Sequence, residues 1–189
     1  MHARVNDVLV LPGRWFAATS AGLFISSDEG KTWDGGPLLG RLGIVSLRSA
    51  GGLLLAATST EILASLDQGA NWQVIKLPPT VSTFSDLVAT SDMTILLVSH
   101  IGVLRSADLG TSWEQSKGLS PGQISFVTSA DSGNTLLGTS ASSGVIFHSR
   151  DGGRSWRLST DSGYRLRRVE SVDGHLVGAT FFDGVIMQQ

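Results

Sequence analysis

Ser26-Ser27-Asp28-Glu29-Gly30-Lys31-Thr32-Trp33 is the stretch that decides the fold, because closely similar stretches return at 65–72, 106–113 and 149–156. All four share the pattern S-x-D-x-G-x-x-W. Their Asp residues are separated by 39, 41 and 43 residues. A period of about 41 residues with one turn motif in each period is typical of a propeller or a similar array of sheets.

Short apolar runs surround each box and are bounded by turn residues, which predicts three strands followed by a fourth that begins at the box Trp. The predicted first strands are 5–11, 44–47, 84–89, 124–128 and 168–172. The second are 15–19, 53–58, 94–99, 135–139 and 175–180, and the third are 23–26, 62–65, 103–106, 145–149 and 185–188. The fourth strands begin at Trp33, Trp72, Trp113 and Trp156, and we expect none in the fifth repeat.

The predicted fold is therefore all-β: a β-propeller of about five four-stranded blades, with the box turn between strands three and four and a three-stranded last blade. We expect one domain over 1–189, with blades at about 4–37, 43–77, 83–117, 123–160 and 166–189. No amphipathic helix of ten residues or more is expected.

Each residue type of the box has a structural reason. An Asp carboxylate accepts hydrogen bonds from the backbone N–H groups of its own turn, and the Ser hydroxyl satisfies further backbone groups. The Gly adopts positive φ at little cost, and the Trp is expected to be buried between neighbouring sheets. The predicted structural positions are Ser26, Asp28, Gly30, Trp33, Ser65, Asp67, Gly69, Trp72, Ser106, Asp108, Gly110, Trp113, Ser149, Asp151, Gly153 and Trp156.

Composition excludes several classes of function. The net charge of −2 gives no general attraction to nucleic acid or to an anionic membrane. No apolar run of signal-peptide or membrane-spanning kind is seen, so the default expectation is a cytoplasmic protein without membrane insertion. The chain has no Cys and its four His residues lack ligand spacing, so neither a metal site nor a cofactor is expected.

The four boxes resemble the Asp-box, or bacterial neuraminidase (BNR), repeats of the sialidase-like superfamily. In style, with Ala17-Ala18-Thr19-Ser20-Ala21-Gly22-Leu23-Phe24 running into the first box, the repeats look most like the photosystem II stability and assembly factor branch. The resemblance implies a β-propeller in which the Asp, Gly and Trp positions are structural. It also implies a partner surface rich in arginine, and it makes glycan binding a second expectation.

The fifth repeat stops where its box is due, so three arrangements are kept. The first is a five-bladed ring whose last blade has three strands, for which we expect a monomer. The second is an arc of a larger propeller, or a chain that pairs with another copy through the incomplete blade. In the third, a partner peptide adds a strand to the edge at 185–188, because an unpaired strand edge is a template for β-augmentation.

Catalytic patterns are weak in this sequence. Sialidase relatives use an arginine triad and a Tyr nucleophile, but Tyr164 falls in an inter-blade link and no Arg-Ile-Pro motif is present. The G-x-S-x-G pattern at 118–122 is another link, where the strand-to-helix turn of a serine hydrolase is not expected. Asp7, Asp86 and Glu170 start first strands and are candidate channel acids of a glycoside hydrolase, with capping of backbone groups as the alternative.

Six of the eleven arginines lie in 19 residues around the fourth box. Five of them are candidate partner-binding residues for an acidic protein, phosphate or carboxylate: Arg154, Arg157, Arg165, Arg167 and Arg168; the sixth is Arg150. Solvated arginines offset by nearby acids are the alternative.

We therefore expect a non-catalytic scaffold or protein-interaction module, an assembly or stability factor for a larger complex. The alternative is a carbohydrate-binding or glycoside-hydrolase-derived module, with Trp15 as its stacking platform or as core.

Overall fold

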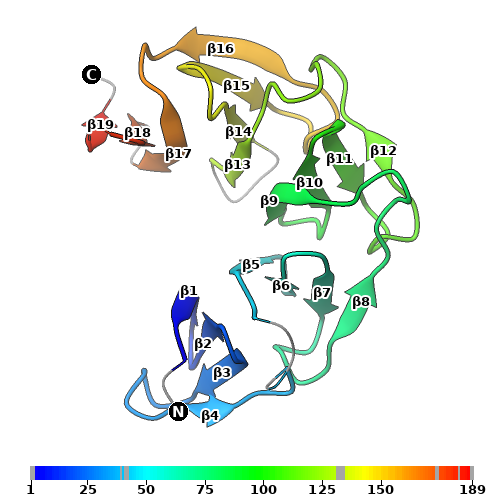
Figure 1. Ribbon diagram of the computed structural model, residues 1–189, viewed down its shortest axis with the longest axis vertical. Coiled ribbons are helices and arrows are strands. Elements are labelled where there is room, and N and C mark those ends of the chain that lie inside the picture. Colours follow the sequence, from blue (N-terminus) through cyan, green and yellow to red (C-terminus); the bar gives the residue numbers. More distant parts are fainter. Residues whose placement is uncertain are drawn as a thin grey trace. The chain divides into compact units, whose positions relative to one another are not determined.

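The computed structural model describes residues 3–38, 40, 43–130, 135–172, 175–182 and 184–187. The chain divides into two compact units, Met1–Leu77 and Pro78–Gln189, which we call unit 1 and unit 2 and describe separately. The prediction of a single domain over 1–189 stays a prediction. The secondary structure of the described residues is all-β, and each sheet is an antiparallel blade (Figure 1).

Unit 1 holds blades 1 and 2, each with four strands in chain order. Blade 1 consists of β1 (Val5–Leu11), β2 (Arg14–Thr19), β3 (Gly22–Ser26) and β4 (Asp34–Gly35). Blade 2 consists of β5 (Ser46–Ala50), β6 (Leu53–Ala57), β7 (Ile62–Ser65) and β8 (Gln73–Ile75). Buried apolar side chains of both blades form one core, among them Phe16, Leu23 and Ile44, and the half-buried Trp72 packs against it.

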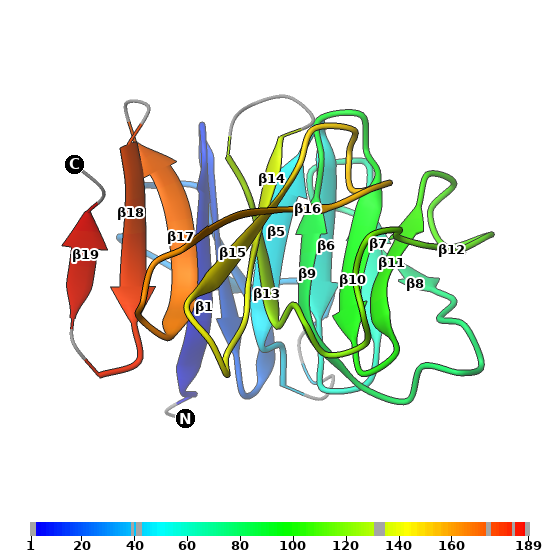
Figure 2. The ribbon, with the colours of Figure 1, turned by 90° about the horizontal axis from the view of Figure 1, so that it is seen from above.

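Unit 2 holds blades 3, 4 and 5. Blade 3 consists of β9 (Phe84–Ala89), β10 (Ile95–Ser99), β11 (Gly102–Ser106) and β12 (Glu114–Gln115), and blade 4 of β13 (Phe126–Ser129), β14 (Leu136–Thr139), β15 (Val145–Ser149) and β16 (Arg157–Asp161). Blade 5 consists of β17 (Leu166–Val172), β18 (His175–Thr180) and β19 (Val185–Met187). Figure 2 shows β19 beside β18 at the end of this last sheet.

The predicted number of blades and the three-stranded last blade are confirmed for the described residues. Three predicted first strands are displaced: those expected at 44–47, 124–128 and 168–172 are at Ser46–Ala50, Phe126–Ser129 and Leu166–Val172. The predicted third strand 185–188 is described as Val185–Met187, and residue 188 lies outside the described residues. Fourth strands begin one residue after each box Trp, because the Trp still belongs to the turn.

The first strands carry a recurring irregularity. The pairing of β1 with β2 shifts between Val5 and Asp7, and that of β17 with β18 shifts between Leu166 and Arg168. A bulge of this kind inserts one extra residue into a strand and re-aims the side chains beside it. The bulges do not explain the misplaced strand starts, because β1 and β9 are also irregular and begin where predicted, whereas β5 and β13 pair without a shift and were misplaced.

Candidate functional site

The box turn is a closed set of hydrogen bonds. In blade 1 the Ser26 hydroxyl donates to Asp28 Oδ1 (2.8 Å) and accepts from the backbone N–H of Gly30 (2.8 Å). Thr32 donates its backbone N–H to Asp28 Oδ1 (2.8 Å) and its hydroxyl to Oδ2 (2.6 Å). Both oxygens of the carboxylate are therefore engaged by residues of the same turn.

The residue before the box Trp is a part of this device that the pattern S-x-D-x-G-x-x-W leaves open. Asn71, Ser112 and Ser155 repeat the two bonds that Thr32 makes to its Asp. A short polar side chain at this position in all four repeats was the signal in the sequence.

These hydrogen bonds stabilise the charged form of each carboxylate. The hydroxyl and the backbone N–H of Thr32 lower the pKa of Asp28 to about 2, and the backbone and side chain of Asn71 do the same for Asp67. The pKa of Asp108 is lowered chiefly by the Ser112 hydroxyl. For Asp151, burial raises the pKa, but the hydrogen bonds from Ser155 and Ser149 outweigh it and the pKa is lowered.

The turn uses two successive left-handed residues, and not only the predicted glycine. Gly30 has φ of 82° and the preceding Glu29 has φ of 60°. The glycine also lies against a neighbouring ring, because a Cβ at Gly30 would stand 2.9 Å from Trp15 Cζ3 and one at Gly69 would stand 2.7 Å from Phe16 Cε1. A side chain at either position would collide with the packing of blade 1.

The box tryptophans differ in burial, contrary to the uniform burial that we expected. Trp33, Trp72 and Trp113 are half-buried, whereas Trp156 is only 3% exposed. The indole N–H of Trp33 donates to the Gly30 carbonyl at 3.0 Å, and Trp72 makes the same bond to Gly69. The indole N–H of Trp156 is buried without a hydrogen-bond partner among the described residues.

The link after blade 3 explains the different environment of Trp156. The Ser116 hydroxyl donates to the carbonyl of Gly153, the box glycine that corresponds to Gly30, at 2.5 Å. Lys117 donates its N–H to the Arg154 carbonyl (2.9 Å) and accepts from the N–H of Trp156 (3.0 Å). The link is thereby fastened along the fourth box.

Two of the candidate channel acids bond the first strand of the next blade. Asp7 accepts from the backbone N–H of Val8 and, across to blade 2, from that of Leu47, both at 2.9 Å. It also pairs with Arg48 at 3.2 Å.

Asp86 makes the same kind of link in unit 2. It accepts from the N–H groups of Leu87 (2.9 Å) and Val127 (3.0 Å). These bonds hold first strands together, which is the capping role.

Glu170 does not share the position of the other two acids. Asp7 pairs with Ala18 of β2, and Asp86 pairs with Val98 of β10. The equivalent residue of the second strand in blade 5 is Ala179, and it pairs with Arg168. The count from the strand start failed because β17 begins at Leu166, two residues before the predicted start at 168. The side chain of Glu170 lies outside the described part of the structure.

The arginines around the fourth box fall into two groups separated by β16. Arg150 and Arg157 line a hollow of about 270 Å³ beside Asp151, and the exposed Arg154 belongs to the same turn. The second group is in the link and first strand of blade 5, with Arg165, Arg167 and Arg168, all of them exposed. Since β16 spans five residues, at roughly 3.3 Å per residue, the two groups are at opposite ends of that strand.

Arg165 belongs to an aromatic cluster that the sequence did not reveal. Its guanidinium donates twice to the Ala141 carbonyl, at 2.9 and 2.8 Å, and lies 5.8 Å from the centroid of Phe181. The Phe181 ring is 6.3 Å from both Phe126 and Phe182. Phe182 is 82% exposed, the highest value among the large apolar side chains of the described residues.

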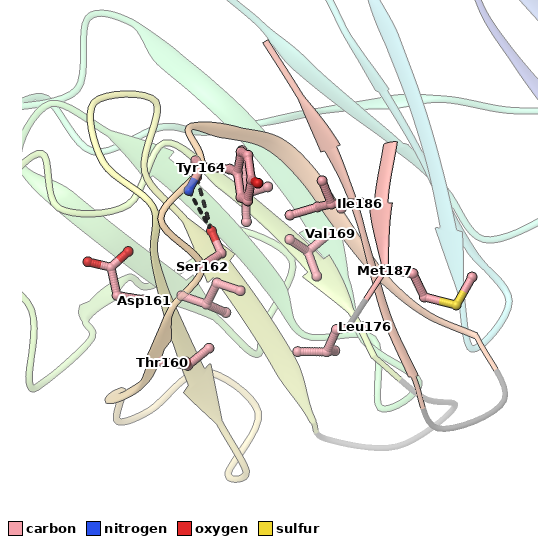
Figure 3. A pocket seen from close by; sticks show the side chains of 11 residues that line it. Thr160, Asp161, Ser162, Tyr164, Val169, Leu176, Ile186 and Met187 are labelled. Carbon is pink, nitrogen blue, oxygen red and sulfur yellow. Dashed lines mark hydrogen bonds between the residues drawn. The ribbon is translucent and has the colours of Figure 1, made fainter. Parts of the chain in front are cut away.

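A hollow of about 420 Å³ lies in unit 2 between blade 4 and blade 5, and we call it the blade 4/5 hollow. Figure 3 shows Val169, Leu176 and Ile186 of blade 5 directed towards the strand end that carries Thr160 and Asp161. Tyr164 lies at the rim, with its backbone N–H donating to the Ser162 hydroxyl at 3.2 Å. The walls are therefore mainly apolar and the rim is polar.

A second hollow, of about 450 Å³, lies beside Trp15 in unit 1 and is also lined by Pro12 and Glu29. Trp15 is half-buried in β2. No group of three or more His, Cys, Asp or Glu residues that could hold a metal ion gathers in the part of the chain that the structure describes. Nor do the described residues form a helix long and apolar enough to cross a membrane.

Comparison with known proteins supports the fold and nothing finer. Neither a protein-family profile nor the sequence of a curated protein matches the chain. Among solved structures, YCF48 bound to D1 peptide is similar with a TM-score of 0.72 and 17% identity, over 99% of this chain and 63% of YCF48. The GH74 enzyme of Niastella koreensis is similar with a TM-score of 0.80 and 19% identity, over 98% of this chain and 29% of the enzyme.

YCF48 from Cyanidioschyzon merolae is also similar, with a TM-score of 0.71 and 15% identity, over 99% of this chain and 67% of that protein. The chain thus spans about two thirds of these YCF48 structures and less than a third of the GH74 enzyme. At such identities the likeness establishes a β-propeller fold.

Proposed function

We propose that this chain is a non-catalytic β-propeller module that binds another protein, in the manner of an assembly or stability factor for a larger complex. The observation that carries the proposal is the apolar surface of the last blade. Phe182, Val185 and Met187 are 82%, 71% and 65% exposed, and Tyr164 is 45% exposed. Clustered apolar side chains on a surface mark interaction sites, and aromatic residues, Met and Arg are the types enriched there.

The arginines of the same region support a protein partner. Arg165 and Arg167 lie in the link and first strand of blade 5, and the guanidinium of Arg165 is held in place by Ala141 and Phe181. An arginine that is already positioned loses less freedom when it binds a carboxylate. The peptide-bound state of YCF48, a protein of similar fold, adds support.

A capture experiment tests this proposal. The tagged chain is incubated with extract of its source cells, and bound proteins are quantified by mass spectrometry. We expect enriched proteins to be lost with Phe182→Ser and with the triple variant Arg165→Ala, Arg167→Ala, Arg168→Ala. Leu66→Ser is the matched control, because Leu66 is 55% exposed in unit 1. Enrichment that is unchanged by the blade 5 variants would refute the proposal.

Carbohydrate binding is the second candidate, and the hollow beside Trp15 is the observation that favours it. A partly exposed indole next to a carboxylate suits a sugar, and GH74 enzymes share the fold. One part of the ring packs on Gly30, which limits the stacking area. A glycan array decides: saccharide binding that is lost in Trp15→Ala would favour this candidate over the scaffold.

A further inference from the structure

Trp156 shows what fills the space between two consecutive blades of unit 2. It belongs to the core between blades 3 and 4, where it is packed with Val103, Ile124 and Phe147. Gly138 of β14 makes room for its ring, because a Cβ at Gly138 would stand 3.1 Å from Trp156 Cζ3. The box Trp is thus the side chain that closes the gap.

The blade 4/5 hollow repeats this environment one blade further along the chain. Gly138 pairs with Phe147 in blade 4, and Gly178 pairs with Ile186 in blade 5. A Cβ at Gly138 would meet Ile124, and one at Gly178 would meet Leu166. Three residues that line the hollow are therefore equivalent to neighbours of Trp156: Leu166 to Ile124, Gly178 to Gly138 and Ile186 to Phe147.

The place equivalent to that of the Trp156 ring is a hollow of about 420 Å³, and no Trp of the described residues lines it. A volume of this size is within the range of about 300–1,000 Å³ that is usual for binding pockets. Its inner wall is Val169, Leu176 and Ile186, which are apolar like their counterparts (Figure 3). The hollow therefore fits a bulky aromatic side chain.

The strand next to the hollow offers a backbone edge in the matching position. In blade 4, β15 pairs with β16 so that Arg157, directly after Trp156, is opposite His148, and Leu158 is opposite Phe147. The equivalents of His148 and Phe147 in blade 5 are Met187 and Ile186 of β19. On the side away from β18, β19 pairs with no strand of the described residues (Figure 2).

We propose that β19 binds an extended segment of a partner protein, antiparallel to β19, with a tryptophan or another large aromatic side chain in the blade 4/5 hollow. The residue after this aromatic lies opposite Met187 and the next lies opposite Ile186. The proposal rests on the protein-binding function proposed above and specifies its ligand. Backbone hydrogen bonds supply affinity in this mode, and the pocket supplies specificity.

A second copy of the chain is a poorer occupant than a partner protein. The four box tryptophans each precede the fourth strand of their own blade, and Trp15 belongs to a second strand. A Trp segment of another copy could reach the hollow only if its own blade opened, and the exposed Phe182 lies in the short turn between β18 and β19 rather than before a free strand. The proposal therefore commits to a segment of a different protein.

The chain itself supplies the peptide probe. A fluorescent synthetic peptide with the sequence of residues 150–161 carries Trp156 and the strand that follows it. Its control is the same peptide with Trp156→Ala. By fluorescence anisotropy with the 189-residue protein, we expect saturable one-to-one binding of the first peptide and about tenfold weaker binding of the second.

Variants of the protein separate the edge from the hollow. Met187→Pro removes a backbone N–H from β19 and Met187→Ala keeps it, so we expect the Pro variant to lose about tenfold more affinity than the Ala variant. Gly178→Ala places a methyl group 2.9 Å from Leu166 Cδ2 and narrows the hollow. Gly178→Ala should therefore lower the affinity for the peptide that contains Trp156 and leave the affinity for the Trp156→Ala peptide unchanged. Circular dichroism spectra establish that each variant is folded.

Three results would overturn the inference. The first is equal affinity of the protein for the Trp and Ala peptides, and the second is equal affinity of Met187→Pro and Met187→Ala for the Trp peptide. The third is a concentration-dependent dimer that the Trp peptide dissociates, because a second copy would then be the occupant. If neither peptide binds but the capture of proteins from extract still depends on Phe182, only this inference is refuted. If protein capture is also unchanged by the blade 5 variants, the proposed function is refuted as well.

Discussion

Replacement of Trp156 by Ala tests the account of how the blades are held together. The side chain is 3% exposed. Burial of roughly 200 Å² of indole at about 25 cal/mol/Å² is worth about 5 kcal/mol. Compact unfolded chains already bury part of this surface, so we expect Trp156→Ala to destabilise unit 2 by about 3–5 kcal/mol.

Urea unfolding followed by circular dichroism measures this loss. With a slope of about 2 kcal/mol/M, a loss of 4 kcal/mol lowers the midpoint by about 2 M. Trp33→Ala is the comparison, because Trp33 is half-buried, and we expect it to cost unit 1 about 1–2 kcal/mol. Limited proteolysis assigns each transition to its unit.

Trp156→Phe removes the indole N–H but keeps an aromatic ring in the core. This N–H is buried without a partner among the described residues, so its removal relieves part of the cost of the smaller ring. We expect Trp156→Phe to lower the free energy of unfolding by less than half as much as Trp156→Ala does. The reasoning is refuted if Trp156→Ala shifts the midpoint no more than Trp33→Ala does.

Three further predictions concern charged side chains. The pKa of Asp28 and that of Asp67 are lowered from 3.8 to about 2, so the contribution of these carboxylates to stability is complete above about pH 4 and is lost as pH falls towards 2. The melting temperatures of Asp28→Asn and Asp67→Asn should therefore fall less on acidification than that of the parent protein. Asp86→Ala leaves the N–H groups that it accepts without this partner and should cost about 1–3 kcal/mol in urea unfolding, with Asp86→Asn costing less. Arg105→Leu removes the donor of the Gly152 carbonyl and should cost about 1–3 kcal/mol, whereas Glu114→Gln should cost less than about 1 kcal/mol because Glu114 is 60% exposed; equal losses would contradict this.

The fold followed from the sequence because one turn recurs with a near-constant period. A turn such as 26–33 depends on local hydrogen bonds, so its residues are legible without knowledge of distant contacts. The role of Thr32 was missed because Thr, Asn and Ser share this position and no one residue type occurs there in all four boxes. What they share is a short polar group that reaches Asp Oδ2.

The site was less predictable, because it depends on register and on contacts between blades. Because β17 begins two residues before its predicted start, Arg168, rather than Glu170, has the position of Asp7. Burial of Arg105 at 4% exposure follows from a carbonyl of the next blade, Gly152, which no local pattern records. The sequence does carry a glycine at the same place in two blades, Gly138 and Gly178. That such a glycine makes room for a tryptophan ring could be inferred only from the position of Trp156 in the structure.

The edge of β19 that faces away from β18 leads from the blade 4/5 hollow to the exposed aromatic and arginine side chains of blade 5. A segment that runs antiparallel to β19 passes Met187 first and then Ile186, and it leaves the strand at the turn that carries Phe181 and Phe182. Arg165 stands over Phe181 at that same turn. The residues of a bound segment that follow its paired stretch would therefore reach the exposed aromatic and arginine surface, while its leading aromatic occupies the hollow. Sensitivity to Phe182→Ser should accordingly grow as the peptide is extended at its C-terminal end and should be absent for the shortest peptide that still binds.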